Sequence, residues 1–291
     1  MAKIVTRQKN FMNTLITFKV VQDKQNTVDI LDSIEDGFGE FDRIVKQYTR
    51  FNEDSELSNL NRNSGNWVQI DKEFFELIEY MLNLAKETDG CFDPTIIDFL
   101  ETYGYDKNYD FSKLDNPKLD DMVKSIAEKR ASFKDIELDK KNLKVKLVKG
   151  QRIDLGGVGK GYAIDCAYDQ LSKVSDNFLI DAGGDIRAKG KNENGEVWKV
   201  ALRNKKSETE IEDIGFIELD NESVASSGSW ARKVKQFHHL INPKTGLPEN
   251  KYTTVYVVGP KAMDCDAWAT TLFVGGEQYL KKHKDLRYFT V

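Results

Sequence analysis

A glycine-rich loop at residues 154–161, DLGGVGKG, is one segment whose composition suits chemistry. Glycines let the backbone approach a ligand closely, and the free N–H groups of a helix N-terminus attract an anion. Lys160 adds a positive charge for a phosphate or a ring carbonyl. The spacing matches neither the GxGxxG fingerprint nor a P-loop, which needs Ser or Thr where Gly161 stands. From this segment alone, a tight structural turn is favoured over a ligand loop.

A carboxylate and a hydroxyl four residues apart form a second candidate. On a helix, Asp266 and Thr270 share one face, with their Cβ atoms about 5–6 Å apart. Hard oxygen donors of this kind suit Mg²⁺, which often takes one or two protein ligands together with substrate phosphate. Taken alone, the pattern is better explained by helix capping through Asp264 or Asp266, with Thr270 packed inside.

Two adjacent histidines, His238 and His239, precede a Pro-Gly turn. Residues 237–241 are predicted to form a strand, so the two rings point to opposite faces and cannot share one metal. One of them could accept a proton, although a structural histidine is the better interpretation from the residues alone. With three histidines in the chain, a multi-histidine zinc site is nearly excluded. Three further segments are most simply interpreted as turns: 90–95, 182–185 and 226–229.

The composition fits a globular chain of 291 residues, with 40% hydrophobic and 31% charged residues. No apolar stretch approaches the roughly 18–20 residues of a membrane-spanning helix. The formal net charge of -5 argues against a broad nucleic-acid surface, while a local loop or metal can still bind phosphate. Three well-separated cysteines, Cys91, Cys166 and Cys265, predict free and mostly buried thiols.

Apolar periodicity predicts the elements that must position these residues. The clearest helix covers 71–88, with Asp71 as its cap and Gly90 at its end. Further helices are expected at 27–49, 161–171 and 266–273, and strands at 11–21, 143–147, 177–181, 197–203, 214–219, 237–241, 252–258 and 286–291. The polar stretch 104–121 is interpreted as a surface excursion. Helices and strands do not alternate regularly, so we expect one compact α+β domain over residues 1–291.

An ordered set of segments resembles the ApbE family, the FAD:protein FMN transferases. The chain has RFNEDSELSNLN at 50–61, TDGCFDPT at 88–95, DLGGVGKGYAID at 154–165 and CDAWATTLFV at 265–274. The similar family patterns are SELSxLN, TDGAFDPT, DLGGIAKGYAVD and ADALSTALFV. Segments 179–185, 224–228 and 239–246 follow in family order, so the resemblance spans residues 11 to about 276. Each motif is weak, but the ordered set is specific.

The resemblance implies binding of FAD with Mg²⁺ and transfer of FMN to a Ser or Thr of an acceptor protein, with release of AMP. It places the Gly157 backbone oxygen, Asp266 and Thr270 on the metal. It places His239 at the position of a general base, and it leaves Asp264 as a helix cap. The residues that it expects to contact FAD are Cys91, Phe92, Asp93, Asp154 and Lys160.

The chain departs from the family pattern at several positions, with Cys91 and Gly159 where Ala is usual and Asn242 where Asp is usual. None removes a side chain that the implied mechanism needs, although Cys91 could reshape the flavin pocket. The alternatives are an FAD pyrophosphatase, in which water replaces the acceptor hydroxyl, and a flavin-binding protein without turnover. A redox flavoenzyme is less favoured because no nicotinamide fingerprint is present.

Residues 1–15 lack the continuous apolar core of a signal peptide, so a cytoplasmic location is expected for the sequence as it stands. Many members of the resembled family are exported lipoproteins. The alternative is therefore an extracytoplasmic, membrane-anchored form from which the signal has been trimmed. The expected partners are FAD and an acceptor protein, with no nucleic acid and no spanning segment. No acceptor segment is evident in the chain itself.

Overall fold

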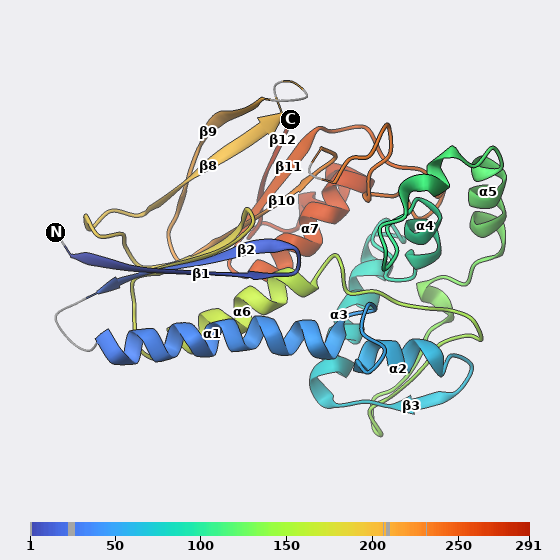
Figure 1. Cartoon of the computed structure of the whole chain (residues 1–291), viewed down its shortest axis with the longest axis horizontal. Coiled ribbons are helices and arrows are strands. Elements are labelled where there is room, and N and C mark those ends of the chain that lie inside the picture. Colours follow the sequence, from blue (N-terminus) through green and yellow to red (C-terminus); the bar gives the residue numbers. More distant parts are fainter. Residues whose placement is uncertain (1, 23–26, 206, 208–209, 231) are drawn as a thin grey trace.

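Seven strands form the central sheet, in the order β1-β2-β6-β7-β10-β11-β12 (Figure 1). The computed structural model describes residues 2–22, 27–205, 207, 210–230 and 232–291. Every neighbouring pair in this sheet is antiparallel. The strands are β1 (Lys3–Phe11), β2 (Thr14–Gln22), β6 (Phe178–Ala182), β7 (Asp185–Lys189), β10 (Ser223–Gly228), β11 (Thr254–Gly259) and β12 (Arg287–Thr290). Antiparallel sheets combined with helices confirm the α+β class.

The helices and the smaller sheets surround this central sheet. The α-helices are α1 (Thr27–Tyr48), α2 (Glu56–Arg62), α3 (Lys72–Glu87), α4 (Ile97–Thr102), α5 (Leu119–Lys129), α6 (Gly159–Leu171) and α7 (Ala262–Gly275). Short 3₁₀ helices are η1 (Phe111–Asp115), η2 (Phe133–Asp135) and η3 (Glu277–Lys282). The smaller sheets are β3 (Trp67–Gln69), β5 (Lys144–Lys146) and β4 (Glu137–Asp139), and the hairpin β8 (Trp198–Lys205) with β9 (Ile211–Leu219). In the described part of the chain, no helix is both long and apolar enough to cross a membrane.

Alternate residues of the central sheet build a hydrophobic layer on each face. On one face, Ile16, Phe18 and Val20 of β2 join the core formed with α1, α6 and α7. On the other face, Val21 and Leu179 pack with the β8–β9 hairpin. Figure 1 shows α1 and α6 on one side of β1 and β2, with the hairpin on the other side. The sheet therefore packs against α6 and α7, and these two helices carry three of the predicted site residues, Lys160, Asp266 and Thr270.

The helix expected at 71–88 is confirmed as α3. The Asp71 side chain accepts a hydrogen bond from the Phe74 N–H at 2.7 Å, which caps the helix. After the C-cap residue Thr88, the backbone turns through positive φ at Asp89 and Gly90. Residues with a side chain adopt positive φ only at a steric cost, whereas glycine does so freely. Gly90 therefore suits the turn that leads into residues 91–95.

Two local expectations are wrong, and a third holds with shifted bounds. Residues 237–241 form no strand, because the Leu240 N–H donates to the His238 Nδ1 at 3.2 Å instead of joining a ladder. The strand expected at 11–21 is confirmed as β2, but it begins at Thr14, because the β1–β2 hairpin turns at Met12 and Asn13. Residues 226–229 do not form a turn, because most of this segment lies in β10. In the first two cases, polar or positive-φ residues interrupt an apolar pattern that otherwise suits a strand.

The stretch 104–121 is more than a surface excursion. It contains η1, and it contributes Tyr105, Leu114 and Leu119 to a separate hydrophobic cluster with Ile241. The abundant aspartates hide this small core in the sequence, because they occupy the solvent side of the same segment. The excursion thus packs against the segment that carries the two histidines.

Glu73 of α3 connects three helices. Arg43 of α1 donates two hydrogen bonds to its carboxylate, at 2.7 and 2.8 Å, and Tyr48 of α1 donates a third at 3.0 Å. Tyr162 of α6 donates a fourth, at 2.5 Å. Burial alone would raise the pKa of Glu73, but the hydrogen bonds from Arg43, Tyr162 and Tyr48 outweigh burial and lower this pKa.

We expect Glu73→Gln to lower the free energy of unfolding by about 1–2 kcal/mol at pH 7, allowing for partial solvent screening. A carboxylate whose folded pKa is depressed stabilises the fold above its unfolded pKa, about 4.3 for Glu. The difference from wild type should therefore shrink as the pH falls through the folded pKa. Urea unfolding at pH 7 and pH 3 measures both values. Glu76→Gln, which removes only an exposed ion pair with Lys72, is the control; an equal loss in both variants would contradict the role of Glu73.

Candidate active site

The N-terminus of α6 meets the first turns of α7. The Gly161 N–H donates to the Asp266 Oδ2 at 3.0 Å, although the two residues are 105 positions apart. A Cβ placed on Gly161 would lie 2.4 Å from the Ala262 carbonyl oxygen, so the two backbones touch here. A Cβ placed on Gly157 would lie 3.7 Å from the Thr270 Oγ1. The glycine loop and the predicted carboxylate–hydroxyl pair therefore lie together.

The expectation that Asp264 caps α7 is wrong. Helix α7 begins after Lys261, which makes no side-chain cap, and the Asp264 carboxylate accepts a hydrogen bond from the Tyr80 hydroxyl at 2.7 Å. The first two N–H groups of α7 instead donate to Asp165, a residue of α6. The cap comes from another helix, so no local pattern in the α7 segment could predict it.

Lys160 lies between two buried carboxylates. It forms an ion pair with Asp185, whose side chain is 1% exposed, and it lowers the pKa of Asp266. Burial, followed by the charge of Asp185, nevertheless raises the pKa of Asp266 above its usual range. Burial alone would lower the pKa of Lys160, but Asp185 and Asp266 outweigh burial and raise it. The two carboxylates therefore keep this lysine protonated.

Asp154 lies at the entrance of the glycine loop. Its carboxylate Oδ2 is 3.4 Å from the Arg50 Nε, and its N–H donates to the Pro94 carbonyl at 2.9 Å. The Arg50 guanidinium also stacks over the Phe51 ring, with 4.2 Å to the centroid. Two of the segments in the family resemblance are thus linked to the glycine loop through Asp154.

The Asp93 carboxylate is held by hydrogen bonds from neighbouring residues of the protein. It is buried, and it accepts hydrogen bonds from Arg130 at 2.8 Å and from the Thr95 N–H at 2.9 Å. Arg130 also donates to the Pro243 carbonyl at 3.1 Å. The Asp93 carboxylate therefore fixes the 91–95 turn against the segment that follows the histidines.

The neighbours of Asp93 in the same turn are also buried. A Cβ on Gly157 would lie 2.9 Å from the Phe92 Cε2, so the Phe92 ring closes one side of the glycine loop. The Cys91 Sγ is 3.5 Å from the Tyr279 hydroxyl. All five residues that the resemblance expects at FAD therefore lie in the glycine loop or in the turn that packs against it.

The two histidines differ in their surroundings. His238 is fully buried; its Nδ1 accepts from the Leu240 N–H, and its Nε2 lies 3.4 Å from the Asn250 Oδ1. The Nδ1 of His239 is buried and has no hydrogen-bond partner among the described residues. Burial, and then the charge of Arg232, lower the pKa of His239 to about 3, so its ring is neutral at pH 7. The first ring is structural, and the second has a nitrogen available for a ligand.

Sequence reasoning missed four side chains that support these groups. Asp185 and Ser227 lie in segments that were interpreted as simple turns, yet Asp185 pairs with Lys160. The Ser227 Oγ lies 3.5 Å from the Thr270 Oγ1. Arg50 and Arg130 hold Asp154 and Asp93. The signal that could have found the first three is their place in the ordered family segments.

The donor set at the α6–α7 junction fits Mg²⁺. It offers one carboxylate, one hydroxyl and the carbonyl of Gly157, a residue whose Cβ position would lie 3.7 Å from the Thr270 Oγ1. The described residues contain no group of three or more His, Cys, Asp or Glu placed to hold a metal. A cation at this junction would therefore depend on the oxygen atoms of a phosphate as well as on the protein, which is the usual mode of Mg²⁺.

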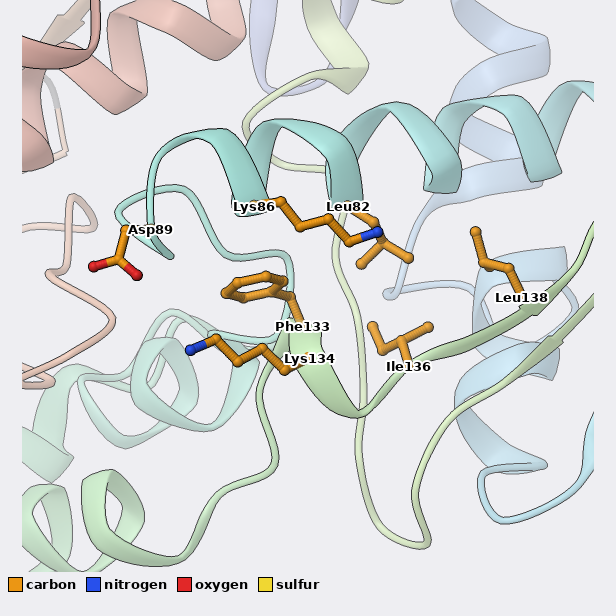
Figure 2. Close-up of a pocket in the computed structure, with 7 residues that line it drawn as sticks. All are labelled: Leu82, Lys86, Asp89, Phe133, Lys134, Ile136 and Leu138. Carbon is orange, nitrogen blue, oxygen red and sulfur yellow. The ribbon is translucent and has the colours of Figure 1, made fainter.

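An open cavity of about 450 Å³ lies elsewhere, between α3 and the η2–β4 segment (Figure 2). Its apolar floor and charged rim are formed by Leu82, Lys86, Asp89, Phe133, Lys134, Ile136 and Leu138. It contains none of the predicted site residues. The cavity is therefore separate from the junction of α6 and α7, where the chemistry-bearing groups gather.

Comparison with known proteins gives consistent matches over nearly the whole chain. A model of the ApbE family matches residues 12–289. The FAD:protein FMN transferase of Haemophilus influenzae is 28% identical, over 94% of this chain and 82% of its own length. The protein of the same name from Chlamydia muridarum is 29% identical, over 80% of this chain and 72% of its own length.

Solved structures agree with this assignment of the fold. The ApbE protein from Thermotoga maritima superimposes with a TM-score of 0.86 at 28% identity, covering 99% of this chain and 94% of that chain. The flavin transferase ApbE from Vibrio cholerae gives a TM-score of 0.85 at 22% identity, covering 100% of this chain and 94% of that chain, and shows the fold alone.

Proposed function

Because this chain belongs to the ApbE family, we propose that it transfers FMN from FAD to a serine or threonine hydroxyl of an acceptor protein. The curated relatives named FAD:protein FMN transferase support an enzyme with this overall activity. The observation that carries the proposal is the meeting of the glycine loop, Asp266 and Thr270 at the α6–α7 junction. This arrangement suits a pyrophosphate, which needs donors, fixed positive charge and a divalent cation.

In the proposed reaction, the acceptor hydroxyl oxygen attacks the phosphorus on the FMN side of the pyrophosphate. The new oxygen–phosphorus bond forms as the bond to the bridging oxygen breaks, and AMP leaves with that oxygen. Such a transfer depends more on positioning and charge neutralisation than on covalent catalysis. Asp266, Thr270 and the Gly157 carbonyl would hold Mg²⁺. Bound Mg²⁺ supplies charge neutralisation for the pyrophosphate and for the departing AMP.

Lys160 and the glycine loop supply the fixed donors of the proposed site. The ion pair with Asp185 orients the Lys160 ammonium, so that little reorganisation is needed when a phosphate binds. In the first turn of α6, the Gly159 N–H donates to the Leu155 carbonyl at 2.7 Å and the Gly161 N–H to Asp266 at 3.0 Å, so among the described residues of this turn the Lys160 N–H is the group left for an anion. Together these groups would hold the non-reacting oxygens of the pyrophosphate.

His239 is the proposed proton acceptor. Its neutral ring and its buried Nδ1, unpartnered among the described residues, suit a group that takes the proton of the acceptor hydroxyl. The low pKa in the ligand-free protein makes it a weak base, but a negatively charged pyrophosphate nearby raises the pKa of an imidazole. Binding of FAD would therefore increase the basicity of His239 at the step that requires it.

The proposal is tested by incubating the protein with FAD, Mg²⁺ and a candidate acceptor prepared without flavin. Flavin fluorescence of the acceptor band on a denaturing gel reports covalent transfer, and chromatography reports AMP. We expect a fluorescent acceptor and an equal amount of AMP. AMP without a fluorescent band would identify an FAD pyrophosphatase, and bound FAD without AMP would identify a flavin-binding protein.

His239→Ala should slow FMN transfer by about 10²–10⁴-fold, because the acceptor hydroxyl then loses its general base. FAD affinity, measured by quenching of flavin fluorescence, should change little. His283→Ala is the matched control, since the His283 ring pairs with Glu87 and packs against Trp268. If His239→Ala transferred FMN at the wild-type rate, the general-base role would be ruled out.

A further inference from the structure

The helices α6 and α7 cap each other. The Asp165 carboxylate of α6 accepts hydrogen bonds from the first two N–H groups of α7, those of Ala262 at 2.9 Å and Met263 at 3.0 Å. In return, the Asp266 carboxylate of α7 accepts the Gly161 N–H of α6 at 3.0 Å. Each helix therefore supplies the N-terminal cap that the other lacks in its own sequence.

The Gly161–Asp266 bond and the Ala262–Asp165 bond are one helical turn apart on both helices. Gly161 and Asp165 are four residues apart on α6, as Ala262 and Asp266 are on α7, and the pairs are matched in opposite order. This pattern fixes the register of one helix along the other. The close contact of Gly161 with Ala262 allows no compensating shift, because a displacement would bring backbone atoms into collision.

Asp165 is itself held in place. The Arg187 Nη1 donates to it at 2.6 Å, and the Arg187 guanidinium stacks on the Tyr168 ring at 3.6 Å. Burial raises the pKa of Asp165, and Arg187 and the two N–H groups oppose that rise. Both carboxylate oxygens of Asp165 thus accept hydrogen bonds. A helix cap needs only one such acceptor, so the side chain is fixed more firmly than capping alone requires.

We propose that Asp165 is a positioning residue for the metal ligands. By fixing the start of α7, it sets where Asp266 and Thr270 lie relative to the Gly157 carbonyl. The inference rests on the proposed function, since it assumes that these three groups hold the divalent cation. Outer residues that orient metal ligands typically contribute about 10–100-fold to metal affinity.

The test is the affinity for Mn²⁺ in the presence of saturating FAD, measured by the loss of the free Mn²⁺ signal in electron paramagnetic resonance, with the Mn²⁺ bound by FAD alone subtracted. We expect Asp165→Ala to weaken Mn²⁺ binding about 10–100-fold. Asp165→Asn keeps one oxygen acceptor and the same shape, so it should fold and show a smaller loss. Asp169→Asn, an exposed aspartate one turn further along α6, should bind Mn²⁺ as wild type does.

Glu73→Gln separates positioning from stability. It weakens the helix packing through a network that contains no metal ligand, so it should lower the Tm without changing Mn²⁺ affinity. Wild-type affinity in Asp165→Ala and Asp165→Asn would overturn the role of Asp165 and leave the proposed transfer standing. A wild-type protein that binds no Mn²⁺ even with FAD present would overturn the metal assignment itself, and the role of Asp165 with it.

Discussion

Replacing Asp266 with alanine should reduce FMN transfer at saturating FAD by about 10³-fold or more, which corresponds to about 4 kcal/mol of transition-state stabilisation. Asp266 is the one carboxylate in the proposed donor set of the metal, and it also caps α6 through Gly161. Its loss removes a ligand and loosens the glycine loop at the same time. The rate of AMP release and the fluorescence of the acceptor on a denaturing gel measure the effect.

Asp266→Asn separates these two roles. The amide oxygen can still accept the Gly161 N–H, while the charge that would bind the cation is removed. Burial and Asp185 raise the pKa of Asp266, so its charge disfavours the metal-free fold. The Asn variant should therefore unfold at the same or a higher Tm above about pH 4, and still fail to transfer FMN.

Asp264→Asn is the matched control on the same helix. Asp264 lies two residues before Asp266, and its carboxylate contacts the Tyr80 hydroxyl and not the glycine loop. We expect transfer within a few-fold of wild type. Normal turnover by Asp266→Asn at ordinary Mg²⁺ concentrations would remove Asp266 from the metal site.

Gly161→Ala should give the second large effect, a loss of FMN transfer together with a lower free energy of unfolding. The new methyl group would lie 2.4 Å from the Ala262 carbonyl oxygen and 2.6 Å from the Met263 Cα, which are backbone atoms that cannot rotate away. Overpacking of this kind costs about 1–3 kcal/mol, and more where backbones must separate. Separation of α6 from α7 would also move Asp266 away from the glycine loop.

Gly159→Ala offers a close comparison in the same helix. A Cβ at Gly159 would meet only the Leu155 Cβ, at 3.7 Å, which is an ordinary contact. Alanine favours the helix by about 1 kcal/mol over glycine, so this variant should be at least as stable as wild type. Urea unfolding should place Gly161→Ala below wild type and Gly159→Ala at or above it, and the transfer assay should show a loss for Gly161→Ala only. Equal behaviour would show that the close contact of α6 with α7 is not needed.

The elements that the sequence predicts well are those whose signals are local. Helix α3 has an aspartate cap, an apolar stripe and a glycine at its end, and all three lie within twenty residues. The segment with His238 and His239 fails because the His238 ring takes a backbone N–H that a strand needs. Strand β10 fails for another reason: its small Ser and Gly residues are typical of turns, yet they are buried in the sheet.

In the candidate site too, local signals and long-range contacts differ in what the sequence can predict. Asp266 and Thr270 alone favour a helix cap, and only the order of the segments in the family resemblance gives them a metal role. Asp165 and Asp185 could not be found from spacing, because Asp165 caps a helix that begins 97 residues later. The prediction that Asp264 is that cap was reasonable from nearby residues alone, but the Tyr80 hydroxyl takes its carboxylate instead.

The reciprocal caps also decide when the site can exist. Neither α6 nor α7 can satisfy its first N–H groups from its own side chains, so each helix end is complete only after the other has docked. A chain with one helix formed and the other undocked would lack the glycine loop in its binding shape. The capacity to bind a pyrophosphate should therefore depend on the docking of α6 on α7, and local opening of either helix should abolish it.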